Sequence, residues 1–287
     1  MRELKGRTAL VTGASRGVGK YIAEALCREG MSVVLLSRSS SELDAVAAEL
    51  GKAGSLTLAI NADLANTADL EQAVQLAEAK FGAIDLLVNN AGLLLTSFYH
   101  TLTPHEIEQI VRVNLVGPMI LSRLVLPGML QRKRGHIVNV ASMEGKYGVP
   151  YDEPYCASKS GIIGFTRSLR AEYRNQGVSA SVVIPTYVSG TGMYQRSVAE
   201  AGATASPPGG LSSPNKIAEA VVRAVRKDKA EILAIPKALP SRLIVASIEL
   251  FPRLNEVMML YSGTGKLSKT IAEYREREKT RQTESMR

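Results

Sequence analysis

The stretch "TALVTGASRGVG", residues 8–19, decides the expected fold of this chain. Its first five residues form an apolar run that predicts a buried β-strand, and a helical run begins at Val18. Gly13, Gly17 and Gly19 stand at the junction. Gly13 permits a tight turn, and the other two glycines let the backbone approach a pyrophosphate and let helix and strand pack closely. The helix N-terminus would add free N–H groups and a partial positive charge.

Beyond this stretch, short apolar runs alternate with longer helical stretches. The apolar runs lie at 8–12, 32–36, 56–60, 84–88, 136–140, 178–184 and 231–235. The helical stretches lie at 18–29, 41–53, 67–81, 104–131, 155–175 and 214–227. This alternation predicts repeated βαβ units and an α/β fold. We expect a Rossmann-like, doubly wound parallel sheet of about seven strands, with helices on both faces. In that setting the glycine pattern is a stronger signal than it is alone.

The alternation also predicts how the chain divides. It continues without a linker from residue 7 to about residue 236, so we expect one domain over 1–236. Residues 186–213 interrupt it and are rich in Gly, Ser, Thr, Ala and Pro. They predict a mobile loop that acts as a lid, the alternative being a passive surface insertion. Residues 237–287 add no strand and are expected to form a helical C-terminal extension.

Composition limits the class of protein. The 287 residues are 45% hydrophobic and 22% charged, which is ordinary for a globular protein with a substantial core. Two cysteines and three histidines, without a His/Cys cluster, predict a reducing compartment and no metal site. A strand-like run that begins by Thr8 leaves no room for a signal peptide, and no run of eighteen uncharged apolar residues is present. We therefore expect a cytoplasmic protein.

The formal net charge of +8 indicates attraction to anions, the alternative being a solvated basic surface. The anion would be a phosphorylated cofactor, an acidic lipid surface or a nucleic acid. No nucleic-acid-binding motif and no interleaving of aromatic and basic residues accompanies the charge, so we do not expect nucleic acid.

The end of the second strand, "LLSRSSS" at 35–41, bears on the choice of cofactor. A site for NAD usually places an acid there to bind the adenosine ribose 2′-OH, but no acid appears before Glu42. Ser37 and Arg38 occupy that place, and Arg16 in the glycine loop adds a second cation. Two guanidinium groups and a hydroxyl suit a 2′-phosphate, which favours NADP. The alternative is that Arg38 is only a solvated loop residue.

Further motifs occur in a characteristic order: "NADL" at 61–64, "NNAG" at 89–92, Asn114 in "VNLVG", Ser142 in "NVAS", and Tyr155 with Lys159 in "YCASK". Together with the glycine loop, they make residues 5–235 resemble the short-chain dehydrogenase/reductase family in its single-domain form. The resemblance implies a catalytic set of Asn114, Ser142, Tyr155 and Lys159, in which the asparagine holds a water near the lysine. It also implies cofactor contacts from Gly13, Ser15, Arg16, Gly17, Val18, Gly19, Ser37, Arg38, Asp63, Leu64, Asn90, Ala91, Gly92, Tyr155, Lys159, Pro185 and Val188.

The residues themselves agree with these implied roles. Tyr155 and Lys159 stand four apart and share one helical face. A free tyrosine has a pKa of about 10 and is a poor base at neutral pH. A lysine one turn away, with the positive nicotinamide, is expected to lower that pKa, so that Tyr155 acts as acid in reduction and base in oxidation. Ser142 follows the fifth strand at the ligand-binding edge and can hold the substrate oxygen.

Two positions depart from the family pattern. In "IPTYVSGTGM" at 184–193, Thr186 stands where a glycine is expected, although Val188 keeps its place. The expected threonine comes one position late, at 191, unless Gly190 replaces it. The contact with the nicotinamide carboxamide is therefore open at this point. Cys156 replaces a more frequent serine beside the tyrosine.

The substrate pocket is expected from the segments 93–99, 143–151 and 187–211, which are predominantly apolar. The predicted wall comprises Leu94, Met143, Tyr147, Tyr151, Tyr187 and Met193. A hydrophobic ketone or secondary alcohol fits such a wall best, the alternative being that several of these side chains belong to the core.

The extension carries a second apolar pattern. Between 239 and 263, one helical stripe is formed by Leu243, Ser247, Leu250, Leu254, Val257 and Tyr261, with Pro252 as a kink or break. Residues 265–282 are basic and helix-like. Either the stripe packs on the domain and the end is solvated or disordered, or the extension is a flap over the pocket, a dimer contact or an interfacial helix on anionic lipid.

These features predict an NADPH-dependent carbonyl reductase that also works in reverse as an alcohol dehydrogenase. One alternative is an epimerase or dehydratase acting on nucleotide sugars, which usually has another glycine spacing and a longer substrate domain. Another is a non-catalytic NADP-binding regulatory or scaffold protein, for which we would expect a broken Ser-Tyr-Lys set. The resemblance also implies a homodimer or homotetramer formed through the helices at 104–131 and 155–175.

Overall fold

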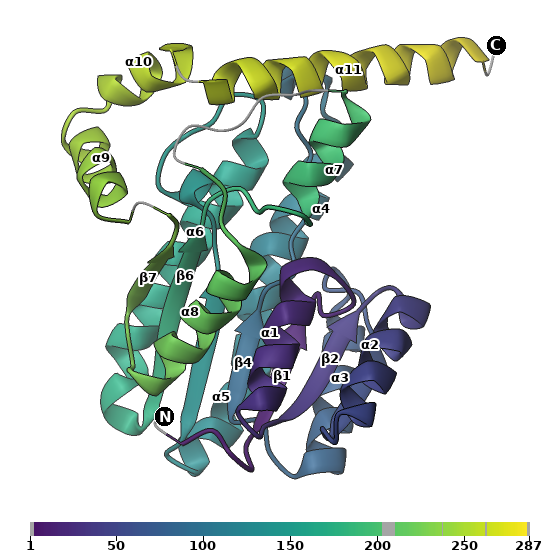
Figure 1. The fold of residues 1–287 in the computed structure, drawn as a ribbon, viewed down its shortest axis with the longest axis vertical. Coiled ribbons are helices and arrows are strands. Elements are labelled where there is room, and N and C mark those ends of the chain that lie inside the picture. The colour runs from purple at the N-terminus through teal and green to yellow at the C-terminus, as the bar shows by residue number, and fades with distance from the viewer. Residues whose placement is uncertain (1–2, 203–209, 237, 262, 286–287) are drawn as a thin grey trace.

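The computed structural model describes residues 3–202, 210–236, 238–261 and 263–285. Seven parallel strands form one sheet in the order β3-β2-β1-β4-β5-β6-β7 (Figure 1). They are β1 Thr8–Thr12, β2 Ser32–Ser37, β3 Thr57–Asn61, β4 Leu86–Asn89, β5 Gly135–Val140, β6 Val178–Pro185 and β7 Glu231–Ala234. The strand order reverses between β1 and β4, which is the switch point of a doubly wound sheet. The predicted fold class is confirmed.

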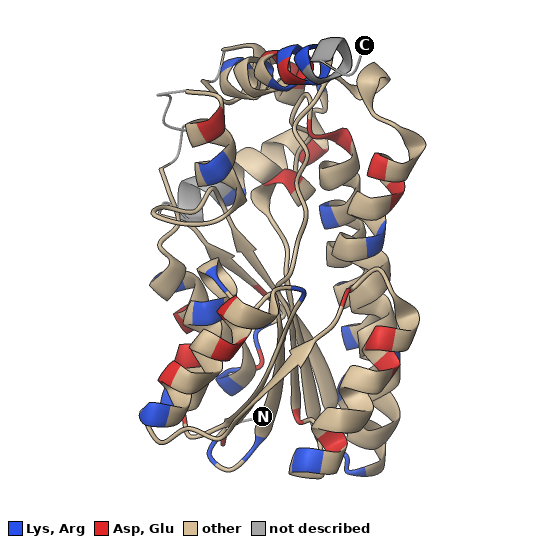
Figure 2. Cartoon of the chain, turned by 90° about the vertical axis from the view of Figure 1, so that its right-hand side faces the viewer, with Lys and Arg blue, Asp and Glu red and all other residues tan. Residues whose placement is uncertain are grey.

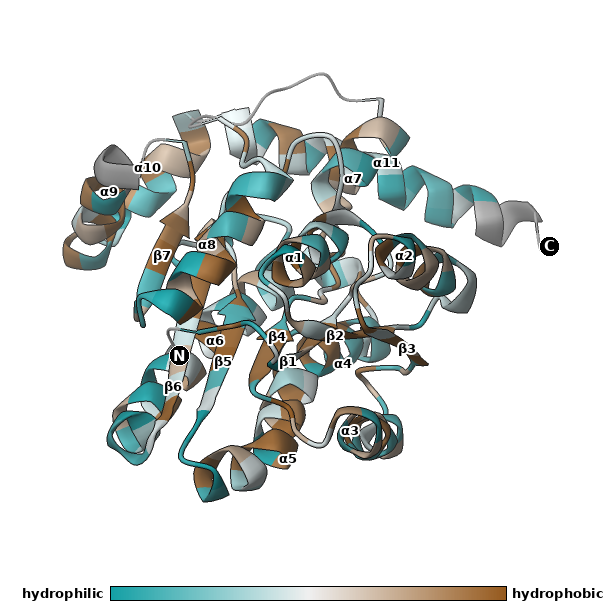
Figure 3. Ribbon diagram, turned by 60° about the horizontal axis from the view of Figure 1, so that its bottom comes forward, coloured by the Kyte–Doolittle hydropathy of each residue, from teal (hydrophilic) through white to brown (hydrophobic). Residues whose placement is uncertain are grey.

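Helices cover both faces of the sheet. One face carries α1 Gly17–Arg28, α2 Ser40–Lys52 and α8 Pro214–Arg226. The other carries α3 Thr67–Phe81, α4 Pro104–Val111, α5 Gly117–Gln131 and α6 Glu153–Tyr173. The strands are mostly hydrophobic, with polar positions in β5 and β6, and the helices carry many hydrophilic residues (Figure 3). Charged side chains accordingly lie mainly on helices and loops (Figure 2).

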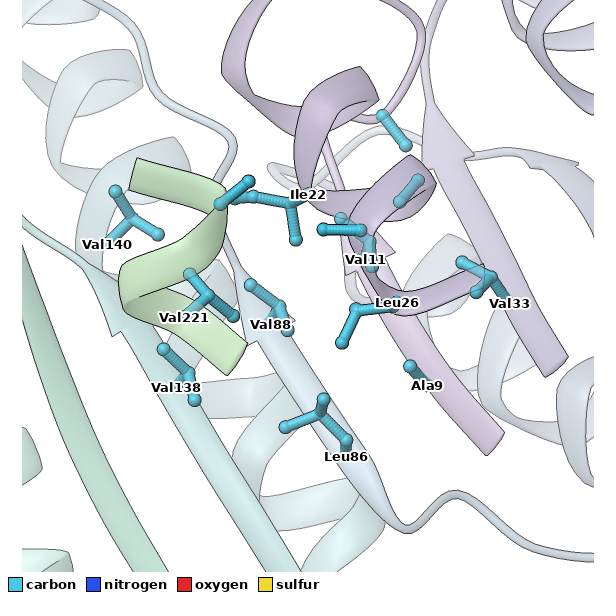
Figure 4. Packing of buried hydrophobic residues seen from close by; sticks show 14 of the residues in the cluster. Ala9, Val11, Ile22, Leu26, Val33, Leu86, Val88, Val138, Val140 and Val221 are labelled. Atoms are coloured by element: carbon cyan, nitrogen blue, oxygen red, sulfur yellow. The ribbon is translucent and has the colours of Figure 1, made fainter. Parts of the chain in front are cut away.

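Burial on both faces explains why the strands read as unbroken apolar runs. In β1, Ala9 and Val11 pack against Ile22 and Leu26 of α1, as Figure 4 shows. Leu10 between them joins the hydrophobic cluster on the opposite face. Successive side chains of a strand point to opposite faces, so a strand buried on both sides favours apolar residues at successive positions. The buried polar residues Asn139 of β5 and Ser181 of β6 form hydrogen bonds with Thr166 and the Lys229 carbonyl.

The predicted helix at 104–131 forms as one run in which α4 and α5 are joined by a π turn, Arg112–Val116. Thr103 begins it with a capping box, because its side chain accepts from the Glu106 N–H and Glu106 reaches back to the Thr103 N–H. By length and composition this run could cross a membrane. Its inner side chains Leu121 and Val125 are buried in the core, as in a core helix of a globular domain.

The segment after β6 differs from its prediction as a loop. It contains a helix, α7 Met193–Glu200, which begins directly after Gly192. The prediction of a loop rested on the overall Gly, Ser and Pro content of 186–213, and so it missed the short helix-forming segment "MYQRSVAE". The proline-rich part at 203–209 lies outside the described residues.

The extension forms three helices, α9 Ala238–Leu250, α10 Arg253–Tyr261 and α11 Gly263–Ser285, and the chain breaks at Pro252 as predicted. The division between 236 and 237 stays a prediction. Of the two alternatives for the helical stripe, packing on the domain is not observed for its large hydrophobic residues: Leu250 is 74% and Tyr261 86% accessible. Val245, Ile248 and Met259 are buried in its place, because the helices turn another face to the domain.

The helix α11 is docked on the domain and is not a solvated end. Leu267, Ile271 and Ala272 are buried on it, and Arg275 and Lys279 form ion pairs with Glu106 of α4 at 3.4 and 3.2 Å. In Figure 1 it crosses the top of the molecule above α4 and α7, with its C-terminal end projecting past the body.

Candidate active site

A cavity of about 980 Å³ opens at the carboxyl edge of the sheet. The ends of β1, β2, β4, β5 and β6 reach its wall, and α6 and α7 complete it. It lies at the switch point between β1 and β4, where ligands bind in sheets of this kind.

The glycine loop forms one end of this cavity. Gly13 and Gly17 have φ angles of +67° and +58°, which side chains rarely adopt. Arg16 stands at the N-cap of α1 without a side-chain cap, so no side chain occupies the N–H groups of the first turn. Gly19 lies behind the wall, where a Cβ would stand 2.0 Å from the Gly13 carbonyl oxygen. Gly19 thus permits the close helix–strand contact expected of it.

The segment after β4 leads from this loop toward Lys159. The Thr12 hydroxyl accepts hydrogen bonds from the N–H groups of Asn90 and Ala91, both at 3.0 Å. Two residues on, a Cβ at Gly92 would stand 3.6 Å from the Lys159 Nζ. Residues 90–92 therefore line the cavity between the glycine loop and Lys159.

Arg16 and Arg38, the two cations predicted to bind a 2′-phosphate, both line the cavity at the end away from Lys159. Arg16, Ser37 and Arg38 line it together with Asp63 and Leu64. The Ser37 hydroxyl donates to the Ser15 hydroxyl at 3.0 Å, which joins the second strand end to the glycine loop. Glu42 also lines this end and pairs with Arg16 across 3.4 Å, both side chains being well exposed.

Ser142, Tyr155 and Lys159 lie together on the opposite part of the wall. Ser142 follows β5 and forms a side-chain hydrogen bond with Tyr155. The Lys159 Nζ lies 5.5 Å from the centre of the Tyr155 ring and donates to the Val140 carbonyl at 3.1 Å. Both side chains are more than nine-tenths buried. The one-turn spacing thus brings phenol and ammonium side by side.

Burial dominates the proton affinities in this cluster. It raises the pKa of Tyr155 above its ordinary value, the charge of Glu144 adds to the rise, and the Ser142 hydrogen bond opposes it. Burial lowers the pKa of Lys159 to about 8, against the opposing charge of Glu144. The expected lowering of the Tyr155 pKa is therefore wrong for the chain alone. Part of that expectation rested on the nicotinamide charge, which comes with the cofactor.

Asn114 lies behind the wall and does not reach the cavity surface. Its Oδ1 accepts from the Leu93 N–H at 2.7 Å, and its Nδ2 donates to the Leu93 carbonyl at 2.8 Å and to Ser158 Oγ at 3.0 Å. The π turn of the 104–131 run presents it there. The described contacts make Asn114 a link between the segment after β4 and α6.

Half of the predicted substrate wall lines the cavity: Leu94, Tyr187 and Met193. Met143, Tyr147 and Tyr151 do not, which corrects the expectation. Met143 is buried among core side chains, and Tyr147 packs beside Val149 and Cys156. The Tyr151 ring stacks edge-on against Phe98, with its backbone at a φ of +73°.

Several residues that line the cavity are not among the individually predicted site residues, although most of them lie in the segments 143–151 and 187–211 from which the pocket was expected. Pro185 and Val188 line the cavity as expected, but so do Thr186 and Thr191. Thr191 Oγ1 lies 3.4 Å from the position of a Cβ on Gly17, so the late threonine stands against the glycine loop. Further wall comes from α7, namely Tyr194, Gln195, Arg196 and Ala199, and from Glu144 two residues after Ser142. No spacing signal in the sequence marks Glu144 as facing inward.

Comparison with known proteins now decides the family. The family model for short chain dehydrogenases matches residues 7–202. The chain belongs to the short-chain dehydrogenase family. Membership supports an oxidoreductase that acts on CH–OH or keto groups.

Two curated relatives and one solved structure of short-chain dehydrogenases are similar over most of the chain. Ketoacyl reductase HetN of Nostoc sp. strain PCC 7120 is 42% identical, over 81% of this chain and 80% of that protein. A 3-oxoacyl-[acyl-carrier-protein] reductase of Synechocystis sp. strain PCC 6803 is 37% identical over 66% of this chain and 77% of its own length. The crystal structure of a metagenomic short-chain oxidoreductase in complex with NADP has a TM-score of 0.69 and 33% identity, covering 80% of this chain and 97% of that one.

Proposed function

We propose that this chain is an NADPH-dependent ketoreductase, reversible as an alcohol dehydrogenase, with its catalytic unit in residues 1–236 and a helical extension in 237–287. One observation carries the proposal: a single cavity holds Ser142, Tyr155 and Lys159 at one end and two arginines at the other. The intact Ser-Tyr-Lys set favours an enzyme over a non-catalytic NADP-binding protein. The match of residues 7–202 to the short chain dehydrogenase family model favours it over an epimerase or dehydratase.

The residues present fit NADP(H). A Cβ at Gly13 would stand 2.9 Å from Ala91 Cα, Gly17 has a φ that side chains rarely adopt, and the uncapped first turn of α1 offers N–H groups to a diphosphate. Arg16, Ser37 and Arg38 would hold the 2′-phosphate, and Asp63 with Leu64 the adenine. Asn90, Ala91 and Gly92 would run along the cofactor, with Pro185 and Val188 near the carboxamide. The NADP-bound solved relative supports this choice.

When bound, NADPH supplies the hydride that the carbonyl carbon accepts. The Ser142 hydroxyl holds the carbonyl oxygen beside the phenol of Tyr155. As the C=O double bond becomes a C–O single bond, its oxygen takes the proton from Tyr155 Oη, and the product is a secondary alcohol. Lys159 stabilises the phenolate that remains, because its ammonium group is fixed one helical turn away. Asn114 holds the segment after β4 against α6, next to Lys159, through its hydrogen bonds with Leu93 and Ser158.

The substrate is proposed to be a small hydrophobic ketone. Leu94, Tyr187 and Met193 present apolar surface beside the catalytic cluster, and Tyr194 of α7 stacks against Tyr187 with ring centres 4.5 Å apart. The names of the two curated relatives make 3-oxoacyl thioesters the first members of this class to test.

We further propose a cytoplasmic homodimer or homotetramer formed through the helices at 104–131 and 155–175, with peripheral lipid contact through the extension. The α9–α10 face supports the lipid contact, because most of the large exposed hydrophobic residues of the described chain gather there: Leu243, Ile244, Leu250, Phe251, Leu254, Val257, Leu260 and Tyr261. The net charge of +8 favours anionic lipid. Sedimentation with phosphatidylglycerol vesicles, compared with phosphatidylcholine vesicles, tests it; light scattering reports the oligomer.

Turnover of a panel of hydrophobic ketones, including 3-oxoacyl thioesters, with NADPH and with NADH tests the proposed function. We expect consumption of NADPH with formation of the secondary alcohol, and much slower consumption of NADH. Preference for NADH would overturn the cofactor assignment and leave the chemistry standing. NADPH binding without turnover of any ketone or of the matching alcohols would favour a binding role.

A further inference from the structure

Glu144 is the one buried carboxyl among the wall residues of the cavity. It lies in a short turn, Met143–Gly145, directly after Ser142, and its N–H donates to the Ser142 hydroxyl at 3.2 Å. Its side chain accepts a hydrogen bond from the Tyr187 phenol. The Oε2 atom is buried and has no hydrogen-bond partner. A carboxylate oxygen left unpaired in the interior is costly unless a charge nearby compensates it.

In the described part of the chain, Lys159 likewise lacks a partner of opposite charge within ion-pair distance. Its side chain is buried, and among the described residues it makes no ion pair within 4.0 Å; its one described hydrogen bond goes to the neutral Val140 carbonyl. The turn that carries Glu144 packs directly on Lys159, since a Cβ on Gly145 would stand 2.7 Å from the Lys159 carbonyl group, and both side chains line one cavity. The charge of Glu144 opposes the fall of the Lys159 pKa that burial causes. A buried ammonium group needs a counter-charge, and Glu144 supplies it from the strand-end turn that also carries Ser142.

We propose that Glu144 is a positioning residue that serves as the buried counter-charge of Lys159 and thereby sets the charge balance at the Tyr155–Lys159 pair. This inference rests on the proposed ketoreductase function. We assign Glu144 an action through these two residues, because its unpaired Oε2 atom is buried.

The titratable groups around Glu144 determine the sign of its effect. The loop after the turn contributes Tyr147, and the N-cap position of α6 contributes Asp152. Helix α6 itself contributes Tyr155, Cys156 and Lys159, and the segment after β6 contributes Tyr187. A negative charge on Glu144 raises the proton affinity of both Tyr155 and Lys159. Burial raises the pKa of Glu144 to about 7, against the Tyr187 hydrogen bond and the Lys159 charge. The carboxyl therefore changes charge near neutral pH.

Glu144→Gln removes the charge and keeps the shape. In the variant, the proton affinity of Tyr155 falls. Loss of reductase activity at high pH and gain of dehydrogenase activity should then both move about one pH unit toward acid. Glu153→Gln is the matched control: it makes the same charge change at the start of the same helix, but in an exposed position. We expect its pH profiles to overlay those of the wild type. Overlaying profiles for Glu144→Gln would overturn the proposal, because a merely structural role changes activity by one factor at all pH values.

A second measurement needs neither turnover nor the variant's stability. In protein labelled with ¹³C at the glutamate carboxyl carbons, one resonance should titrate near pH 7 in the wild type. It should also be absent from Glu144→Asp. The same titration in wild type and in Lys159→Met would overturn the proposal, because the carboxyl that balances the lysine must respond to loss of the ammonium group. Failure of the ketone panel with a resonance that titrates near pH 7 would instead count against the proposed function alone.

Discussion

Lys159 donates a hydrogen bond from Nζ to the main-chain carbonyl of Val140, the last residue of β5, at 3.1 Å. The bond fastens α6 to the carboxyl edge of the sheet at the point where the catalytic cluster stands. An ammonium group has three N–H donors, so the Val140 bond leaves two for Tyr155 and for a bound cofactor.

Replacing Lys159 by methionine tests the importance of this anchored charge. The variant keeps an unbranched side chain one atom shorter but loses the ammonium group, so phenolate on Tyr155 is no longer stabilised. We expect kcat/KM for ketone reduction to fall about 10²- to 10⁴-fold. Lys216→Met, an exposed change on α8, serves as the control. Steady-state kinetics with NADPH measures both, and comparable rates for the two variants would refute the role.

Cofactor choice is tested at Arg38. Replacing it by alanine removes one cation from the end of the cavity that we assign to the 2′-phosphate. We expect kcat/KM for NADPH to fall about 10- to 100-fold, since hydrogen bonds to charged groups contribute about 1.5–3 kcal/mol. Activity with NADH should hardly change. Arg28→Ala, at an exposed position on α1, is the control. Equal losses with both cofactors would show that Arg38 does not read the 2′-phosphate.

The fold could be predicted from the sequence because the inner strands, such as β1, are buried on both faces. Leu10, for example, lies between two residues that face the other side, so no position in β1 tolerates a polar side chain except at its ends. The resulting apolar runs locate the strands closely. The helix α7 escaped prediction because it is only eight residues long and lies among glycines and prolines.

The site could be predicted only where the spacing of residues along the sequence determines their relative positions in the structure. Tyr155 and Lys159 share a face because they lie one turn apart, and the glycines precede a helix. Glu144 has no such signal, because the direction of a side chain in a three-residue turn depends on tertiary contacts. The same holds for the extension: a helical stripe is visible in the sequence, but only the docked structure shows that Val245 faces the domain and Leu250 faces outward.

Gly19→Ala should destabilise the protein. The new Cβ would stand 2.0 Å from the Gly13 carbonyl oxygen, so helix α1 must move away from β1. We expect the free energy of unfolding to fall by about 1–3 kcal/mol, as in overpacked cores. Gly164→Ala is the control: it lies inside α6 with nothing within 4 Å of the new carbon, and should stabilise by about 0.5–1 kcal/mol. Urea unfolding measures both; a stable Gly19→Ala protein would contradict the close contact.

Stability should depend on pH through Glu144. Its pKa is raised from 4.5 in the unfolded chain to about 7 in the folded protein. Between these values the folded state holds a proton that the unfolded state has released, so this group's contribution to the free energy of unfolding falls as pH rises. Relative to Glu144→Gln, the wild type should lose at most about 3 kcal/mol between pH 4.5 and 7. Urea unfolding at both pH values tests this; a pH-independent difference between the two proteins would contradict it.

The most direct test of the central claim is NADPH-dependent reduction of a turned-over ketone by Tyr155→Phe. The variant keeps the ring but lacks the hydroxyl that donates the proton. We expect kcat/KM to fall by on the order of 10²- to 10⁴-fold while NADPH affinity, measured by titration, stays unchanged. Turnover at the wild-type rate with intact NADPH binding would contradict the account.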